Sequence, residues 1–126
     1  MKDQINTMMG ELWPGAAPRC VAVDDKSARA ELTTEERDLR PGGFISGPAQ
    51  FGAADAAFWF AVLGALGRVE PMALTSELSI RFLRPARGTR LVAEARVDKL
   101  GKRQAVGTVR VWTDDVDKPC AVAQGT

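Results

Sequence analysis

The apolar positions of the chain are densest between residues 48 and 66, where a single charged side chain, Asp55, interrupts them. Pro48 suits the first position of a helix, and Ser46 before it is a good N-cap residue. Gly67 then closes the segment. Because the predicted helix is apolar on nearly all sides, it must be buried on nearly all sides.

Alternation of apolar and polar residues predicts strands on both sides of this helix. Residues 17–23 and 27–33 form a predicted pair around the turn "DDK". After the helix, further strands are predicted at 72–83, at 89–100 and 103–114 (an antiparallel pair joined at "GK"), and at 118–126.

Two other segments complete the predicted order. Residues 2–13 place Ile5, Met9 and Leu12 at helical spacing, and the "PG" that follows ends the pattern. We therefore expect a short amphipathic helix at the N-terminus. Residues 34–47 are rich in glycine and proline and are predicted as a loop.

This order favours an α+β fold, in which an antiparallel sheet of about five to six strands wraps the long helix. The 126 residues suffice for one domain and not for two ordinary ones, so a single domain over 1–126 is expected. One sheet of this size cannot cover an apolar helix on all sides. A second copy related by a two-fold axis is the simplest way to complete the burial.

Charge and residue types narrow the possible functions. The net charge of +1 gives no electrostatic reason to expect binding to nucleic acid or to an anionic membrane. The chain has no histidine, which excludes Ser-His-Asp and Cys-His catalysis and histidine metal ligation. Cys20 and Cys120 are far apart in the sequence, so no thiolate metal site is expected. Both are predicted to be reduced core residues, with a disulfide as the open alternative.

The N-terminal sequence "MKDQINTMMGELW" carries acidic residues and has no long apolar run, so it is not typical of a secretory signal. The longest uninterrupted apolar run, residues 56–67, is too short to span a bilayer. We therefore expect a cytoplasmic protein without a membrane-spanning segment.

Three stretches carry a family resemblance: a glycine-rich loop that runs into a helix with one acid, the segment "SIRFLRPARGTRLVAEARV", and the hairpin "KLGKRQAVGTVRVW". Over roughly residues 36–126 the chain resembles the hotdog-fold acyl-CoA thioesterases, in particular the phenylacetate-pathway (PaaI-like) branch. The resemblance implies a hotdog fold, a coenzyme A thioester as the substrate without a further cofactor, and homodimers that can pair into tetramers.

In that family a His-Gly-Gly loop precedes the helix, and the catalytic acid lies nine residues after the His. Nine residues before Asp55 is Ser46, so "SGP" corresponds to this loop and "PGG" at 41–43 does not. The resemblance then implies that Gly47 donates its N–H to the thioester oxygen. It implies that Asp55 is the nucleophile or general base and that the Thr75 hydroxyl helps to hold the attacking water.

The chain departs from the family pattern at three positions. Ser46 stands in place of the His, Pro48 in place of the second Gly, and Arg40 in place of a frequent Asn. A helix N-terminus still supplies an N–H donor and the positive end of the helix dipole. Asp55 lies roughly 10 to 12 Å along the axis from the helix start. The resemblance solves this distance by symmetry, because the loop of one subunit faces the acid of the other.

Each of these residues has a structural alternative. Asp55 could be a buried carboxylate that binds a neighbouring strand, and Gly47 could be a simple turn glycine. Ser46 could cap the helix or contact the substrate, and of the two we favour the cap. Thr75 could be an ordinary strand residue.

Further candidates concern substrate binding. Phe51, Phe58 and Trp59 could line an acyl pocket, although an aromatic helix face is more often core. Arg84, Lys102 and Arg103 could bind the phosphates of coenzyme A, although basic residues on a hairpin are usually only solvated.

Two functions follow. The first is hydrolysis of a medium-chain or aromatic acyl-CoA. The second is a non-catalytic hotdog module that binds acyl-CoA or another hydrophobic ligand. A hydratase or dehydratase of the same fold would need a His, and the chain has none.

Overall fold

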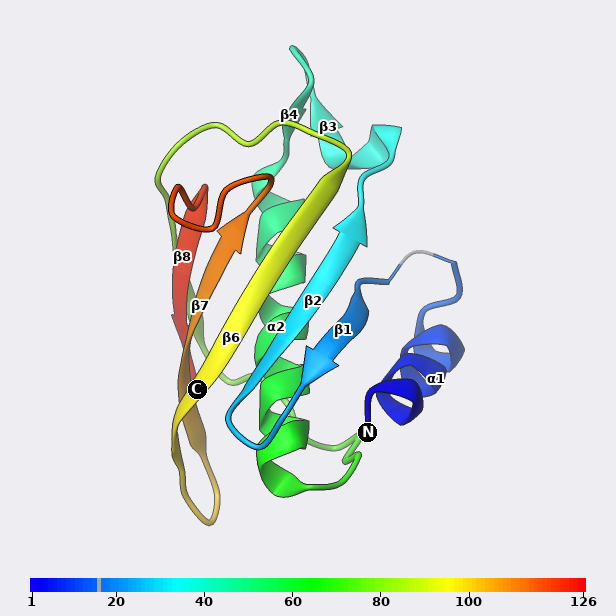
Figure 1. The fold of residues 1–126 in the computed structure, drawn as a ribbon, viewed down its shortest axis with the longest axis vertical. Coiled ribbons are helices and arrows are strands. Elements are labelled where there is room, and N and C mark those ends of the chain that lie inside the picture. Colours follow the sequence, from blue (N-terminus) through cyan, green and yellow to red (C-terminus); the bar gives the residue numbers. More distant parts are fainter. Residues whose placement is uncertain (16) are drawn as a thin grey trace.

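The computed structural model describes residues 1–15 and 17–126 and shows a six-stranded sheet packed on one long helix (Figure 1). All strand pairs in this sheet are antiparallel. In chain order the elements are α1 (Lys2–Leu12), β1 (Arg19–Val23), β2 (Ser27–Thr33), α2 (Gly47–Leu66), β5 (Leu78–Phe82), β6 (Arg90–Leu100), β7 (Ala105–Trp112) and β8 (Ala121–Gly125). The sheet order is β1-β2-β6-β7-β8-β5, so β1 and β5 form its edges. The predicted α+β arrangement is confirmed.

Helix α2 is built from the local signals of its sequence. The Ser46 hydroxyl accepts a hydrogen bond from the Ala49 N–H at 3.2 Å, which confirms Ser46 as the N-cap. The helix begins at Gly47, so Pro48 is its second residue and not its first as predicted. Either position tolerates proline, because the N–H groups of the first turn have no partner inside the helix. At the other end Gly67 adopts a φ of 72°, a left-handed conformation that favours glycine.

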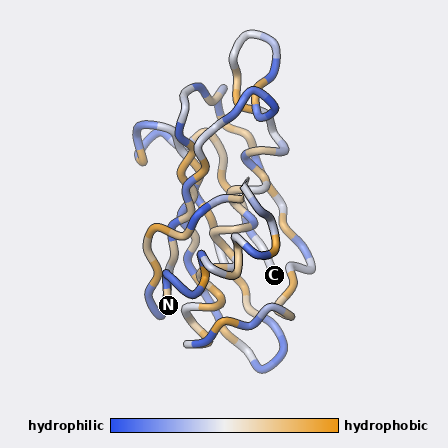
Figure 2. Tube along the Cα trace, turned by 90° about the vertical axis from the view of Figure 1, so that its right-hand side faces the viewer, coloured by the Kyte–Doolittle hydropathy of each residue, from blue (hydrophilic) through white to orange (hydrophobic). Residues whose placement is uncertain are grey.

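The sheet buries one side of α2 very closely. A Cβ at Gly64 would collide with the Asp24 carbonyl oxygen in the turn between β1 and β2, so glycine alone allows this approach. By length and composition α2 could cross a membrane, but it packs along the sheet as the core helix of the domain. Figure 2 shows the complementary pattern, with hydrophilic residues in the loops at both ends of the molecule.

The predicted loop 34–47 contains more structure than expected. It holds a single 3₁₀ turn, η1 (Glu36–Asp38), and a two-stranded hairpin of β3 (Leu39–Arg40) and β4 (Phe44–Ile45). Gly42 and Gly43 have φ angles of 92° and 80° and form the hairpin turn. Such short pairs leave too few alternating positions to be recognised in a sequence.

The predicted strand 72–83 was wrong in its first half, since β5 begins only at Leu78. Its partner β8 runs out at this point: Leu78 pairs with Gly125, and Thr126 binds Ser76 and Glu77. Residues 71–77 belong to no strand of the described chain and form a connecting segment that returns to α2, where Thr75 binds Asp55. Smaller differences occur at β1 and β8, which start at Arg19 and Ala121, later than predicted.

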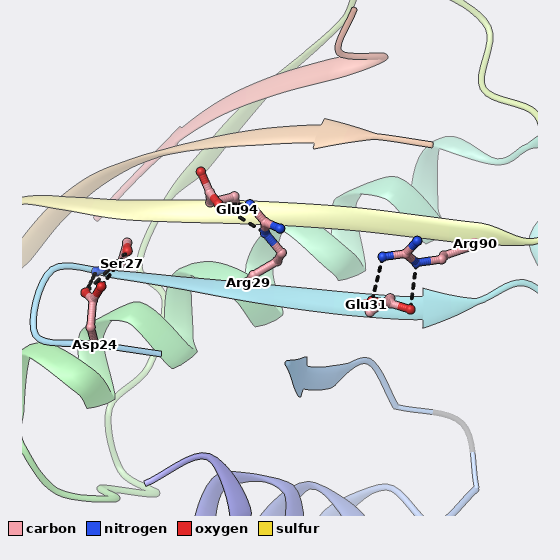
Figure 3. A network of polar contacts seen from close by, with 6 residues as sticks. All are labelled: Asp24, Ser27, Arg29, Glu31, Arg90 and Glu94. Carbon is pink, nitrogen blue, oxygen red and sulfur yellow. Dashed lines mark hydrogen bonds and ion pairs between the residues drawn. The ribbon is translucent and has the colours of Figure 1, made fainter. Parts of the chain in front are cut away.

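The outer face of the sheet, opposite α2, is polar and internally paired (Figure 3). Arg29 binds Glu94 at 2.6 Å and Arg90 binds Glu31 at 2.7 Å. The Arg29 guanidinium also lies 5.3 Å from the centre of the Trp112 ring. In the Arg29–Glu94 and Arg90–Glu31 pairs, each arginine neutralises the charge of its glutamate on the outer face of the sheet.

At the β1–β2 turn, two backbone N–H groups that bind Asp24 lower the pKa of its carboxyl.

Candidate active site

The most specific polar contact beside α2 joins Asp55 to Thr75. The Thr75 Oγ1 donates a hydrogen bond to Asp55 Oδ1 at 2.6 Å. Asp55 is half-buried on α2, and Thr75 comes from the exposed segment 71–77. Among the described residues no donor reaches Asp55 Oδ2. One carboxylate oxygen is therefore held by protein, and the other can accept a proton from a bound molecule.

A second functional group lies at the first turn of α2. No acceptor within the described part of the chain receives the Gly47 N–H, and Gly47 is partly exposed. A Cβ on this residue would lie 3.2 Å from Cζ of Phe82, so the position is already narrow. The Gly47 N–H points from the positive end of the helix, where backbone donors bind anionic oxygen.

Gln50 supports this first turn and was missed as a candidate. It is buried, and its amide Nε2 donates to the Ile45 carbonyl at 3.1 Å, which ties α2 to β4. A buried amide inside an apolar helix is the signal that could have identified it.

The two groups cannot act together within one copy. Gly47 and Asp55 are eight residues apart in the same helix, which separates them by about 12 Å along its axis. A single carbonyl needs its donor and its attacking group within roughly 3 Å each. The structure therefore keeps Gly47 and Asp55 of one copy too far apart to act on the same carbonyl, as the sequence predicted.

Two clefts meet at the segment that carries Thr75. We call the first the α1 cleft; it lies between α1, α2 and residues 71–75 and has a volume of about 660 Å³. Asp55 and Thr75 line it, together with apolar side chains of both helices. We call the second the basic cleft; it has a volume of about 560 Å³ and includes Lys102 and Arg103 from the β6–β7 loop. Trp59 and Thr75 border both clefts.

The predicted aromatic residues occupy three different environments. Phe58 is 2% exposed and packs against Gly107 and Gly125 of the sheet, although its ring also borders the basic cleft. Trp59 meets Trp13 of the N-terminal segment edge-on, with ring centroids 6.2 Å apart. Phe51 is exposed on α2 and borders neither cleft.

The predicted basic residues divide between the two ends of β5. Lys102 and Arg103 lie beside Thr126 and Ser76, close to where β5 begins. Arg84 follows the other end of the strand, where its N–H approaches the Cys120 carbonyl. One copy of the chain does not bring the three side chains together.

The contribution of α1 was not predicted from the sequence. Met9, Leu12 and Trp13 line the α1 cleft together with Trp59 and Leu74. The sequence indicated an amphipathic helix, but nothing in its pattern showed which surface it covers.

Comparisons with known proteins agree with this fold. The family model of the Thioesterase superfamily matches residues 42–120. A protein of Saccharolobus solfataricus that carries the provisional name of an esterase is 34% identical over 99 residues, covering 79% of this chain. The chain spans 64% of that relative's length.

Solved structures are similar over nearly the whole chain. A Silicibacter protein described provisionally as a thioesterase has a TM-score of 0.85 and 33% identity, covering 98% of this chain and 88% of its own. A mutant thioesterase of Pseudomonas aeruginosa has a TM-score of 0.79 and 26% identity, with coverages of 99% and 90%. The PaaI protein of the Escherichia coli phenylacetic acid degradation operon has a TM-score of 0.73 and 25% identity, with coverages of 98% and 86%. The chain therefore belongs to the thioesterase superfamily and has its hotdog fold.

Proposed function

We propose that this protein hydrolyses acyl-CoA thioesters as a two-fold dimer, in which Asp55 of one copy and Gly47 of the other act on the same thioester. The observation that carries the proposal is the placement of the two groups at opposite ends of β5. Gly47 lies against Phe82, at the end of the strand, whereas Thr75 and Asp55 lie before its start.

Strand β5 is an edge of the sheet, so its outer side has unpaired backbone groups. If two copies pair antiparallel along β5, with the two-fold axis near Ile80, then Phe82 of one copy lies beside Leu78 of the other. This pairing would carry Gly47 of the partner subunit toward Asp55 and Thr75. Phe82 and Leu83 expose large apolar surface at the same edge, which a second copy would cover.

The chemistry then follows from the contacts of each group. The Gly47 N–H binds the thioester oxygen and stabilises the negative charge that develops there. Asp55 Oδ2 accepts the proton of a water whose oxygen bonds to the acyl carbon, while Thr75 holds Oδ1. The tetrahedral intermediate collapses by breaking the C–S bond, and the leaving sulfur takes the proton. In the alternative, the Asp55 carboxylate attacks the acyl carbon, the C–S bond breaks and the thiolate leaves. Water then hydrolyses the mixed anhydride, which releases the acid and a proton and restores the Asp55 carboxylate.

The same pairing gives the three basic residues a common role. Arg84 of the partner subunit would lie near the start of β5, where Lys102 and Arg103 border the basic cleft. Arg68 lines the same cleft, so the cations outnumber Glu70, the one acidic side chain among its described lining residues, and suit the phosphates of coenzyme A. We therefore propose that the nucleotide part of the substrate lies in the basic cleft.

Mixing two inactive variants tests the shared site. Asp55→Asn removes the base, and Gly47→Pro removes the N–H while keeping a helical φ. Each variant alone is expected to lose activity on a panel of acyl-CoAs, measured as the release of free thiol. After subunit exchange, the mixture should recover about a quarter of wild-type activity, because half of the dimers are mixed and each has one intact site of two.

The outcomes separate the parts of the proposal. Loss in both variants without recovery after confirmed exchange would refute a site shared between Asp55 of one copy and Gly47 of the other. Full activity in Asp55→Asn would refute its catalytic role. If the wild-type protein binds acyl-CoA saturably and never hydrolyses it, the chain is a binding module and the proposed activity is wrong.

A further inference from the structure

We infer that α1 forms one wall of the acyl pocket and that Leu12 and Trp13 limit the length of the acyl group. The inference rests on the proposed function, since it takes acyl-CoA as the ligand. It goes beyond that function because α1 lies outside residues 42–120, the part of the chain that matches the family model. The wall is thus made by the N-terminal segment, which the family model does not cover.

The α1 cleft has the composition of an acyl site. Met9 of α1, Trp59 of α2 and Pro71 of the connecting segment give it apolar walls, and Asp55 and Thr75 stand at one side. Its volume of about 660 Å³ lies within the usual range of small-molecule sites, roughly 300 to 1,000 Å³. An acyl chain in this cleft would have its reacting carbon next to the carboxylate.

The two clefts differ in polarity in the way that the two ends of an acyl-CoA differ. The basic cleft carries Lys102 and Arg103, whereas the α1 cleft has no basic side chain among its described lining residues. The clefts meet at Thr75. A ligand that crosses this point would place its phosphates on one side and its apolar tail on the other.

Leu12 and Trp13 form the outer part of the cleft. Leu12 is 49% exposed and Trp13 is 52% exposed, and Leu74 in the same cleft is 80% exposed. Large apolar side chains that line an open cleft gain free energy when an apolar ligand covers them. The Trp13 ring rests edge-on against Trp59, so it closes the cleft at a defined place.

The wall is fixed to the sheet independently of these two side chains. Asn6 binds both backbone groups of Cys20 on β1, donating to the carbonyl and accepting from the N–H at 2.8 Å each. Ile5 and Met8, on the inner face of α1, are buried. Shortening the side chain of Leu12 or Trp13 to alanine should therefore leave α1 in place.

Binding of S-alkyl-CoA thioethers tests the inference without requiring turnover. These compounds keep the chain and the nucleotide but cannot be hydrolysed, so the dissociation constant can be measured by calorimetry over a series from methyl to dodecyl. For the wild-type protein each added methylene should tighten binding, by roughly fourfold at most, until the cleft is filled. Trp13→Ala and Leu12→Ala should extend the series to longer chains and leave the methyl compound unchanged.

A matched control is Val116→Ala, which truncates an exposed apolar side chain in the β7–β8 loop, away from both clefts. It should leave the whole series unchanged. A profile of chain lengths that is identical in wild type, Trp13→Ala and Leu12→Ala would overturn the inference. So would an equal weakening at every length, since a merely structural role predicts it.

A third overturning result is a change of oligomeric state without a change in binding, for example in Trp13→Asp. That result would assign the exposed face of α1 to contact with another copy. Failure of the proposed activity is measured separately, because an inactive wild-type protein can still show the length-dependent binding series.

Discussion

The first and third turns of α2 are held in place by different means. At the first turn the functional group is a backbone N–H, and the Ser46 cap and the Gln50 tie to Ile45 fix it from both sides. At the third turn the functional group is the Asp55 side chain, and one hydroxyl on an exposed segment holds it. The proposed oxyanion donor is therefore held by the fold itself, whereas the proposed catalytic carboxylate depends on a single contact that one substitution can remove.

The largest effect is expected at the first turn, from a pair of variants that differ only in the donor. Gly47→Ala and Gly47→Pro both place a Cβ near Phe82, but only proline removes the N–H. A Cβ 3.2 Å from the Phe82 ring requires only a small shift, and both variants share it, so the alanine variant should lose far less activity than the proline variant. The proline variant should lose roughly 10² to 10³ in kcat, the usual cost of one oxyanion donor.

Steady-state kinetics on the best acyl-CoA of the panel measures both variants, with circular dichroism to confirm the fold. Equal activity in the two would contradict an oxyanion role for Gly47.

A smaller effect is expected at the third turn. Thr75→Val keeps the shape of the side chain and removes the hydrogen bond to Asp55, so kcat should fall by roughly tenfold, as for other hydrogen bonds to charged groups. Thr75→Ser keeps the hydroxyl and should restore most of kcat. Loss of activity in both variants to the same extent would point to packing instead.

The smallest effect is expected at the cap. Ser46→Ala removes the acceptor for the Ala49 N–H, which should cost about 1 kcal/mol of unfolding free energy. Ser46→Asn can accept the same bond and should recover that stability. Denaturant unfolding measures the change, and KM for acyl-CoA should stay the same in both variants. A raised KM at full stability would instead place Ser46 in contact with the substrate.

The same contrast explains what the sequence could and could not predict. The boundaries of α2 follow from Ser46, Pro48 and Gly67, which act on their own neighbours and can be recognised locally. The start of β5, at Leu78, depends on where its partner β8 stops. Alternation within 72–83 cannot show this, so it predicted a strand that was too long.

The site divides in the same way. Asp55 is recognisable as one charge in an apolar helix, and the spacing to Gly47 follows from counting residues. The α1 cleft depends on how α1 docks on the sheet, where Asn6 binds Cys20, fourteen residues away, and no local signal predicts that contact. Pocket walls made by distant segments are set by tertiary packing, which overrides local preference.

The glycine at position 64 couples α2 to the β1–β2 turn. Since the Asp24 carbonyl fills the place of its Cβ, no other amino acid fits there while the β1–β2 turn keeps its shape. A Cβ added at Gly52, on the same helix, would meet nothing within 4 Å, so no such collision restricts that position. In a redesign of this scaffold, a side chain at position 52 would enter the α1 cleft without changing the fold, whereas position 64 can change only together with the turn that rests on it.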